Sequence, residues 1–254
     1  MGPTPSGPGG GVSVPPHPHL GLQTVTWLFD GAVLHRDSLG SEQLIRPGQL
    51  NLMTAGAGIA HAEEDPGGGD GGRVHGMQLW VAQPEATRGE APAFEHHRDL
   101  PEVDVDHGTA TVLVGAFAGA ASPARRDTEH VGVELDLRPG TSVLPVEPSH
   151  EHALVVAEGE PSVDGVRVTP GRLAYVDPGA EELVLTSATP AVALLIGGVP
   201  FDEDLVLWWN FAARTRDELA DAYRGWTRGD ERFGGVASAL PRVVVAPPPW
   251  LGDA

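Results

Sequence analysis

The sequence predicts an all-β protein that consists of two barrels in tandem and a short C-terminal helix. Turn-forming residues are abundant, with 34 glycines and 24 prolines among 254 residues. Such a composition favours many short strands over long helices. Runs of β-branched and aromatic residues recur at intervals of roughly 8–12 residues with turn signals between them, and this spacing is typical of sandwiches and barrels. One amphipathic helical pattern follows the last predicted strand.

The first block of strands follows a Gly/Pro-rich lead-in over residues 1–16. The predicted strands cover residues 22–29, 32–37, 50–54, 74–81 and 111–117. Asp30-Gly31 separates the first two, and Asp-Gly between two apolar runs predicts a hairpin. Gly56 and Gly58 permit a bend with positive φ shortly before residue 61. Residues 84–110 are mixed in character and are expected to form mainly loops.

A second block begins near His130 and repeats features of the first. Its predicted strands cover residues 131–137, 153–157, 163–168, 173–176, 182–185 and 191–196. The triplet His150-Glu151-His152 parallels an earlier His17-Pro18-His19, which suggests a duplicated barrel. We therefore divide the chain into a lead-in (1–16), an N-terminal domain (17–128), a C-terminal domain (129–204) and a terminal strand, helix and tail (205–254).

The last segment changes from strand to helix. Residues 205–211 are apolar, and residues 215–218 match the Ser/Thr-x-x-Glu pattern of a helix N-terminus. Apolar residues then follow at i, i+3, i+4 and i+7, which places them on one helix face: Leu219, Ala222, Tyr223 and Trp226. Packing of this face on a barrel is the simplest interpretation, and a partner-binding helix is the alternative.

Composition excludes several classes of function. All 16 basic residues are arginines, so a lysine Schiff base is excluded, and the absence of cysteine excludes disulfides and thiolate ligands. A net charge of −19 disfavours direct binding to nucleic acid. No window approaches the roughly 18 apolar residues of a membrane span. The N-terminus has no basic and apolar pattern of a secretory signal, so we expect a cytoplasmic protein.

Two short triplets carry the chemical information, His17-Pro18-His19 and His61-Ala62-Glu63. Residues two apart on a strand point to the same side, so each triplet can present two ligands to one face of a sheet. Two such strands would surround a point with three imidazoles and one carboxylate. That set suits a divalent first-row metal and leaves positions open for water, O₂ or substrate. The alternative is two unrelated surface histidine clusters.

Other histidines have weaker roles in this interpretation. His35 and His75 are candidates to hydrogen-bond the outer nitrogens of the ligands, because such partners fix the ligand tautomer. An ordinary surface or core histidine is the alternative for each. His150 and His152 could begin a second site, but residues 173–178 offer no histidine to complete it. We therefore expect the C-terminal barrel to lack a complete metal site.

Together these motifs resemble the pirin family of the cupin superfamily. The resemblance covers residues 15–235 approximately. The matching segments are His17-Pro18-His19, Thr24-Val25-Thr26, His35-Arg36-Asp37-Ser38, Met53-Thr54-Ala55-Gly56, His61-Ala62-Glu63, Gly76-Met77-Gln78-Leu79-Trp80-Val81 and Trp208-Trp209-Asn210-Phe211.

The resemblance implies two cupin barrels (double-stranded β-helix or jelly-roll type), with one metal in the N-terminal barrel. Its ligands would be His17, His19, His61 and Glu63. Iron as Fe(II) is the expected metal, with other divalent first-row metals as alternatives. Some pirins are quercetin 2,3-dioxygenases, which implies flavonol-like or enolic small molecules and O₂ as substrates. Glu63 could then serve as a ligand only, or detach to accept the substrate proton.

The same resemblance implies a second function. Other pirins are described as redox-responsive regulators, so this chain could be a non-catalytic iron sensor that binds a transcription factor or a metabolic enzyme. A small-molecule isomerase is a third option, because cupin barrels host many reactions and fold does not determine function.

Overall fold

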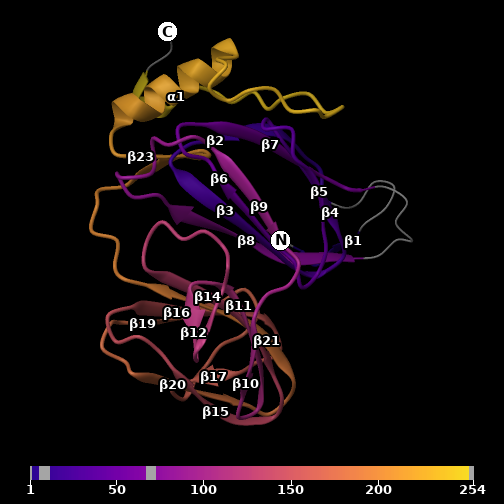
Figure 1. Cartoon of the computed structure of the whole chain (residues 1–254), viewed down its shortest axis with the longest axis vertical. Coiled ribbons are helices and arrows are strands. Elements are labelled where there is room, and N and C mark those ends of the chain that lie inside the picture. Colours follow the sequence, from indigo (N-terminus) through magenta and orange to yellow (C-terminus); the bar gives the residue numbers. More distant parts are fainter. Residues whose placement is uncertain (1, 6–11, 67–72, 252–254) are drawn as a thin grey trace. The chain divides into compact units, whose positions relative to one another are not determined.

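The computed structural model describes residues 2–5, 12–66 and 73–251 and divides the chain into two compact units (Figure 1). The first unit joins residues 1–98 to residues 203–254, and the second contains residues 99–202. Both consist of facing antiparallel sheets, which confirms the predicted all-β class with two barrels and a short terminal helix.

The first unit contains two sheets that enclose one interior. The larger sheet has the order β1 (Thr4–Pro5), β8 (Arg73–Ala82), β3 (Leu22–Asp30), β6 (Leu50–Thr54) and β9 (Ala93–His97). The smaller sheet has the order β2 (Val14–His19), β7 (Ile59–Glu64), β4 (Val33–Asp37) and β5 (Glu42–Ile45). Leu28 and Val74 of the larger sheet pack against Val33 and Ile45 of the smaller one. Burial of these aliphatic side chains stabilises the facing arrangement.

The second unit repeats this plan. Its larger sheet has the order β10 (Glu102–Val105), β11 (Gly108–Val114), β14 (His130–Leu137), β21 (Ala191–Gly198), β16 (Glu151–Glu158) and β19 (Leu173–Val176). The smaller sheet has the order β15 (Gly140–Pro145), β20 (Glu182–Ser187), β17 (Ser162–Val163) and β18 (Val166–Arg167). A hairpin of β12 (Ala116–Phe117) and β13 (Ala120–Ala121) adjoins them. Leu135 and Leu195 pack with Leu144 and Leu185 in a continuous aliphatic core.

The C-terminal segment returns to the first unit. It contains β22 (Val206–Trp208), β23 (Phe211–Ala213), α1 (Arg216–Arg228) and a 3₁₀ turn at Pro249–Leu251. The backbone N–H of Glu218 donates to Thr215 Oγ1 over 3.2 Å, as predicted for the helix start. Leu219 and Trp226 on the apolar face of α1 are buried together with Ala60 of β7. The helix therefore covers the outer face of the sheet that carries β2 and β7 (Figure 1).

Replacement of Leu219 by alanine should destabilise the first unit by about 2–5 kcal/mol, because its side chain is fully buried and leaves a cavity. Chemical denaturation followed by tryptophan fluorescence measures the loss. Arg224→Ala, at an exposed position of the same helix, is the matched control and should change stability by no more than about 0.5 kcal/mol. Equal stability of both variants would show that the helix face contributes little to the fold.

The predicted hairpin at Asp30-Gly31 is wrong. Strand β3 pairs with β6 and β8, whereas β4 pairs with β5 and β7, so the turn leads from one sheet into the other. Gly31 has a φ of 84°, and a Cβ atom there would lie 2.4 Å from the carbonyl oxygen of Arg73. The glycine is thus required for a tight corner between sheets.

The expected loop over residues 84–110 is also corrected in part, because it contains β9, β10 and the start of β11. Strands β9 and β10 lie at sheet edges and carry polar side chains, so no apolar run in the sequence indicates them. Contacts group residues 99–128 with the second unit, in contrast to the sequence-based division, because β10 and β11 pair in line with β14. In the lead-in, β1 and the start of β2 are ordered strands, and residues 6–11 lie outside the described residues.

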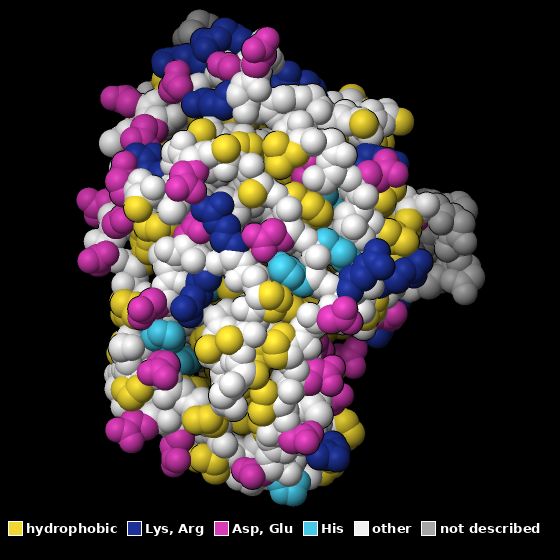
Figure 2. Space-filling model, in the orientation of Figure 1, with side chains coloured by type: hydrophobic (Ala, Val, Ile, Leu, Met, Phe, Trp, Pro, Cys, Tyr) yellow, Lys and Arg dark blue, Asp and Glu magenta, His cyan; other side chains and the backbone are white. Residues whose placement is uncertain are grey.

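Acidic residues outnumber basic ones in the chain, 35 to 16. Carboxylate side chains are scattered over the face drawn in Figure 2, with arginines between them, in keeping with the net charge of −19. The α-helix of the described residues has 13 residues, and none of the helices in this part of the chain is long and apolar enough to cross a membrane.

Candidate metal centre

The two histidine triplets lie on neighbouring strands of the first unit. Strands β2 and β7 are antiparallel, with His17 opposite His61 and His19 opposite Ile59. Because side chains alternate along a strand, His17, His19 and His61 all point to the same side of the sheet. This side is the interior, where the three rings have exposed fractions of 6%, 1% and 0%.

The three imidazoles converge on one point. Their ring centroids are 4.3–5.0 Å apart, and one nitrogen from each ring lies within 4.8 Å of the others. The Nε2 atoms of His19 and His61 are 3.1 Å apart. Metal–nitrogen bonds of about 2.1 Å would place two ligands of one ion at about this separation. The residues therefore fit a metal ion bound between the rings.

Hydrogen bonds on the far side of two rings set their tautomers. The Nδ1–H of His17 donates to the carbonyl of Pro15 over 2.9 Å. The Nδ1–H of His19 donates to the carbonyl of Asn210 over 3.2 Å. Because a neutral imidazole carries one proton, both Nε2 atoms keep their lone pairs. Outer partners of this kind orient metal ligands in proteins.

The third ring is oriented by a relay of side chains. His61 Nδ1 lies 3.4 Å from His35 Nδ1, and His35 Nε2 lies 3.2 Å from Asp37 Oδ2. The carboxylate only accepts, so His35 Nε2 carries the proton and His35 Nδ1 accepts from His61 Nδ1–H. This leaves the lone pair of His61 on Nε2, toward the other two rings. The Phe94 ring stacks on His35 at 4.5 Å and holds it in place.

Burial favours the neutral form of the three converging rings. It lowers the pKa of His19 to about 3, with His17 adding to the shift and the hydrogen bond to Asn210 opposing it. It also lowers the pKa of His61 well below its ordinary value, and the neighbouring histidines add to this shift. The pKa of His17 is also lowered by burial, against the hydrogen bond to Pro15. Neutral imidazole is the form that binds metals, so protons compete weakly for these nitrogens near neutral pH.

Glu63 is buried in the same unit, but it does not belong to the group of ligand atoms that lie within 4.8 Å of one another. Its Oε1 accepts hydrogen bonds from Gln78 Nε2 over 2.8 Å and from Thr26 Oγ1 over 3.4 Å. Thr26 and Gln78 are opposite each other on β3 and β8 of the facing sheet. Burial raises the pKa of Glu63, against the influence of His35 and of these two hydrogen bonds.

The other predicted histidines lie at different distances from this centre. His35 joins it through the relay, whereas His75 packs against the Phe29 ring at a centroid distance of 5.2 Å. Sequence reasoning missed Asp37, Asn210, Thr26 and Gln78. Asp37 follows His35 at i+2 and could have been found by the same spacing rule. The Asn210 contact spans 191 positions of the chain and has no local signal.

Comparisons with known proteins agree with this picture. The Pirin family model matches residues 1–81, and the model of the pirin C-terminal cupin domain matches residues 132–234. A Pseudomonas aeruginosa protein named putative quercetin 2,3-dioxygenase is 44% identical over 255 residues, which cover all of this chain and 80% of that protein. A Caulobacter vibrioides pirin-like protein is 37% identical, over 90% of this chain and 81% of its own.

One similar solved structure extends the comparison to the fold. The crystal structure of quercetin 2,3-dioxygenase from Acinetobacter baumannii has a TM-score of 0.90 and 41% identity. The match covers 97% of this chain and 83% of that one. The predicted tandem of cupin barrels is thereby confirmed.

Proposed function

The chain belongs to the pirin family, and we propose that it is a metal-dependent dioxygenase of the quercetin 2,3-dioxygenase type. Its substrates would be O₂ and a flavonol-like or other enolic small molecule. The observation that carries this proposal is the convergence of three buried, neutral imidazoles whose lone pairs share one point. The names of the similar proteins from Pseudomonas and Acinetobacter support the same reaction type.

We assign His17, His19 and His61 as metal ligands and Glu63 as the carboxylate of the site. Divalent iron, the metal we favour, would supply Lewis acidity and one-electron redox capacity for O₂ chemistry. The ligand set carries one negative charge at most, so it would leave net positive charge on a divalent ion. The protein contributes orientation, because each imidazole is held from behind by a hydrogen-bond acceptor.

Glu63 is placed to accept the acidic proton of an enolic substrate. Both of its hydrogen bonds end on Oε1, so we assign Oε2 as the oxygen that takes the proton. A carboxylate with a raised pKa is a stronger base than an ordinary one, as general base catalysis requires. Gln78 and Thr26 orient the carboxylate during this transfer.

A half-exposed aromatic side chain next to the histidines offers a surface for a flat substrate. The Trp80 ring meets the His19 ring edge to face at a centroid distance of 5.3 Å and is 44% exposed. Aromatic rings stack favourably in offset or perpendicular arrangements. We propose that Trp80 orients the aromatic part of the substrate beside His19.

Glu63→Gln should separate the two roles open to this residue. With Glu63 as the base, oxygen uptake falls by about 10²–10⁴-fold, because a neutral amide cannot accept the proton. The metal content stays close to that of the unmodified protein, since the three imidazoles are intact. Metal content by mass spectrometry and oxygen uptake are measured on the same samples. A parallel loss of metal and activity would instead mark Glu63 as a ligand only.

The proposed activity is tested with protein loaded anaerobically with Fe(II). Quercetin and O₂ are then added, and oxygen consumption is followed with an electrode. We expect turnover that greatly exceeds uptake by the same amount of Fe(II) in buffer. Uptake no faster than this reference would contradict the proposed function.

A further inference from the structure

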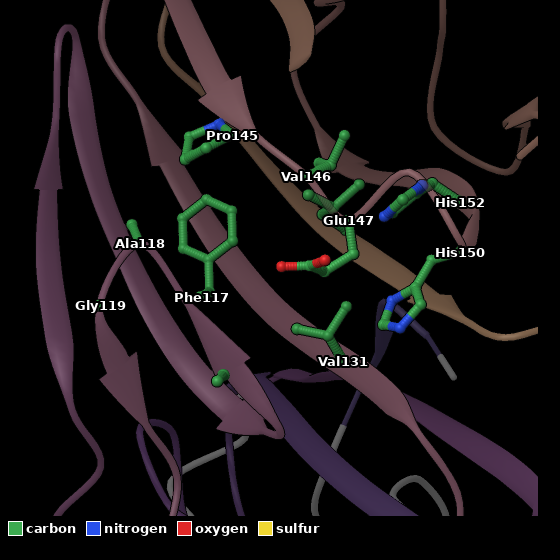
Figure 3. A pocket seen from close by; sticks show the side chains of 11 residues that line it. Phe117, Ala118, Gly119, Val131, Pro145, Val146, Glu147, His150 and His152 are labelled. Carbon is green, nitrogen blue, oxygen red and sulfur yellow. The ribbon is translucent and has the colours of Figure 1, made fainter. Parts of the chain in front are cut away.

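The second unit has a pocket of its own, at one end of its barrel (Figure 3). Its volume is about 260 Å³, and its apolar wall includes Phe117, Val131 and Leu195. Along the strands, Val131, Gly197 and His152 form one cross-strand row of β14, β21 and β16. Deeper rows of this interior are filled by aliphatic side chains. The pocket therefore lies where the packed core ends, a common position for ligand sites in barrels.

Two buried histidines line the pocket and lack hydrogen-bond partners for one nitrogen each. His150 and His152 are 6% and 2% exposed, and the Nδ1 atom of each is buried and unpaired. Figure 3 shows both rings on one side of the pocket, across from the Phe117 ring. Buried polar atoms are rarely left unpaired in folded proteins, so such atoms indicate a place for a polar ligand or water.

Gly197 makes room for one of these rings. A Cβ atom at this position would lie 2.5 Å from Cδ2 of His152. The imidazole thus lies directly over the backbone of β21, where only a glycine allows it. Burial lowers the pKa of His152, with His150 adding to the effect, so this ring is neutral near pH 7. It can donate one hydrogen bond and accept another.

The charges around the pocket restrict the class of ligand. Figure 3 shows the Glu147 carboxylate directed into the pocket, and none of the residues that line it is an arginine. An anionic ligand would face this carboxylate without a compensating cation. A metal ion in this pocket is also disfavoured. Among the described residues, only His17, His19 and His61 bring three metal-ligand atoms from different side chains within 4.8 Å of one another.

We propose that this pocket binds a small, uncharged, hydroxylated aromatic molecule of the phenol class. Its ring would lie between Phe117 and Leu195, and its hydroxyl groups would pair with His150, His152 and the Glu147 carboxylate. The volume suits a single ring, and the mixture of apolar walls with a few polar groups is typical of small-molecule sites. The site is separate from the metal centre, since all its residues belong to the second unit.

Resorcinol is a suitable probe, because its two hydroxyl groups are too far apart to chelate a metal. The protein carries His17→Ala and His61→Ala, which remove the metal centre as a competing site. Calorimetry should give a Kd of about 0.1–1 mM, a range that fits a ligand of this size. Adding His150→Ala and His152→Ala should weaken binding at least about tenfold, whereas the exposed His107→Ala serves as control and should have no effect. Benzoate, of similar size but anionic, should bind at least about tenfold more weakly.

Several outcomes would overturn this inference. If resorcinol does not bind, or binds equally well without His150 and His152, the proposed site is wrong. If benzoate binds as strongly as resorcinol, the argument from the charges around the pocket is wrong. A second metal equivalent that disappears with His150→Ala/His152→Ala would identify a metal site instead. If this variant fails to fold, the proposal is tested with the ring ¹⁵N shifts of His150 and His152 in the unmodified chain. They should move on addition of resorcinol, and unchanged shifts would contradict the proposal.

Discussion

His61→Ala is expected to abolish metal binding and oxygen uptake with quercetin. The ring contributes one of three nitrogens within 4.8 Å of each other, and its Nε2 lies 3.1 Å from that of His19. Loss of an outer partner alone weakens metal sites by about 10–100-fold, and loss of a ligand should cost more. Metal content by mass spectrometry, after purification and anaerobic loading with Fe(II), checks the first effect. An oxygen electrode checks the second.

His96→Ala is the matched control for this variant. His96 lies in the same unit, where its Nδ1 contacts the Asn51 side chain over 2.6 Å, and it is not one of the three converging rings. The control should keep about one equivalent of iron and the full rate of oxygen uptake. Unchanged metal content in His61→Ala would disprove the assignment of this ring as a ligand. If the unmodified protein keeps its metal but consumes no oxygen, the assignment of the metal site stands and the proposed dioxygenase activity is rejected.

The sequence predicts the members of the centre better than their surroundings. The spacing of two residues within each triplet already placed the side chains on one face, because strand geometry alone requires it. The same rule extends to His35 and Asp37, which lie on one face of β4, opposite Glu63 and His61. Contacts across the barrel follow no such rule. The hydrogen bonds from Thr26 and Gln78 to Glu63 depend on how two sheets face each other.

The fold shows the same division between local and distant information. Strands with β-branched and aromatic residues, such as β3 and β8, were predicted within about a residue of their observed limits. Edge strands such as β9 and β10 escaped notice, since their partners and not their own composition hold them in the sheet. The Asp30-Gly31 turn was identified, but its sequence does not reveal whether the next strand pairs with the previous one or crosses to the other sheet.

Asp37→Asn should weaken metal binding by about 10–100-fold, although it leaves the shape of the site unchanged. Asp37 Oδ1 accepts backbone hydrogen bonds from Leu39 and Ser41, each 2.9 Å long, so the asparagine oxygen must keep this position. The amide nitrogen then faces His35 Nε2 in place of Oδ2. An amide nitrogen donates only, which forces His35 to carry its proton on Nδ1.

The changed tautomer of His35 then alters the tautomer of the metal ligand His61. With a proton on His35 Nδ1, the Nδ1 atom of His61, 3.4 Å away, has to accept, and the His61 proton moves to Nε2. That atom faces His19 Nε2 and could no longer bind a metal through its lone pair. The ¹⁵N shifts of the His61 ring report this exchange directly in the metal-free protein, and a competition titration with a chelator reports the affinity.

A comparison variant separates this tautomer effect from a change of charge. Asp30→Asn makes the same chemical change at a residue of the same unit that pairs with Arg73 over 3.1 Å at the surface. Its metal affinity and the His61 ring shifts should match those of the unmodified protein. Asp37→Asn should also leave the free energy of unfolding of the metal-free protein almost unchanged, because both backbone hydrogen bonds persist. A metal affinity within about threefold of normal, with the proton still on His61 Nδ1, would show that the relay does not orient the ligand.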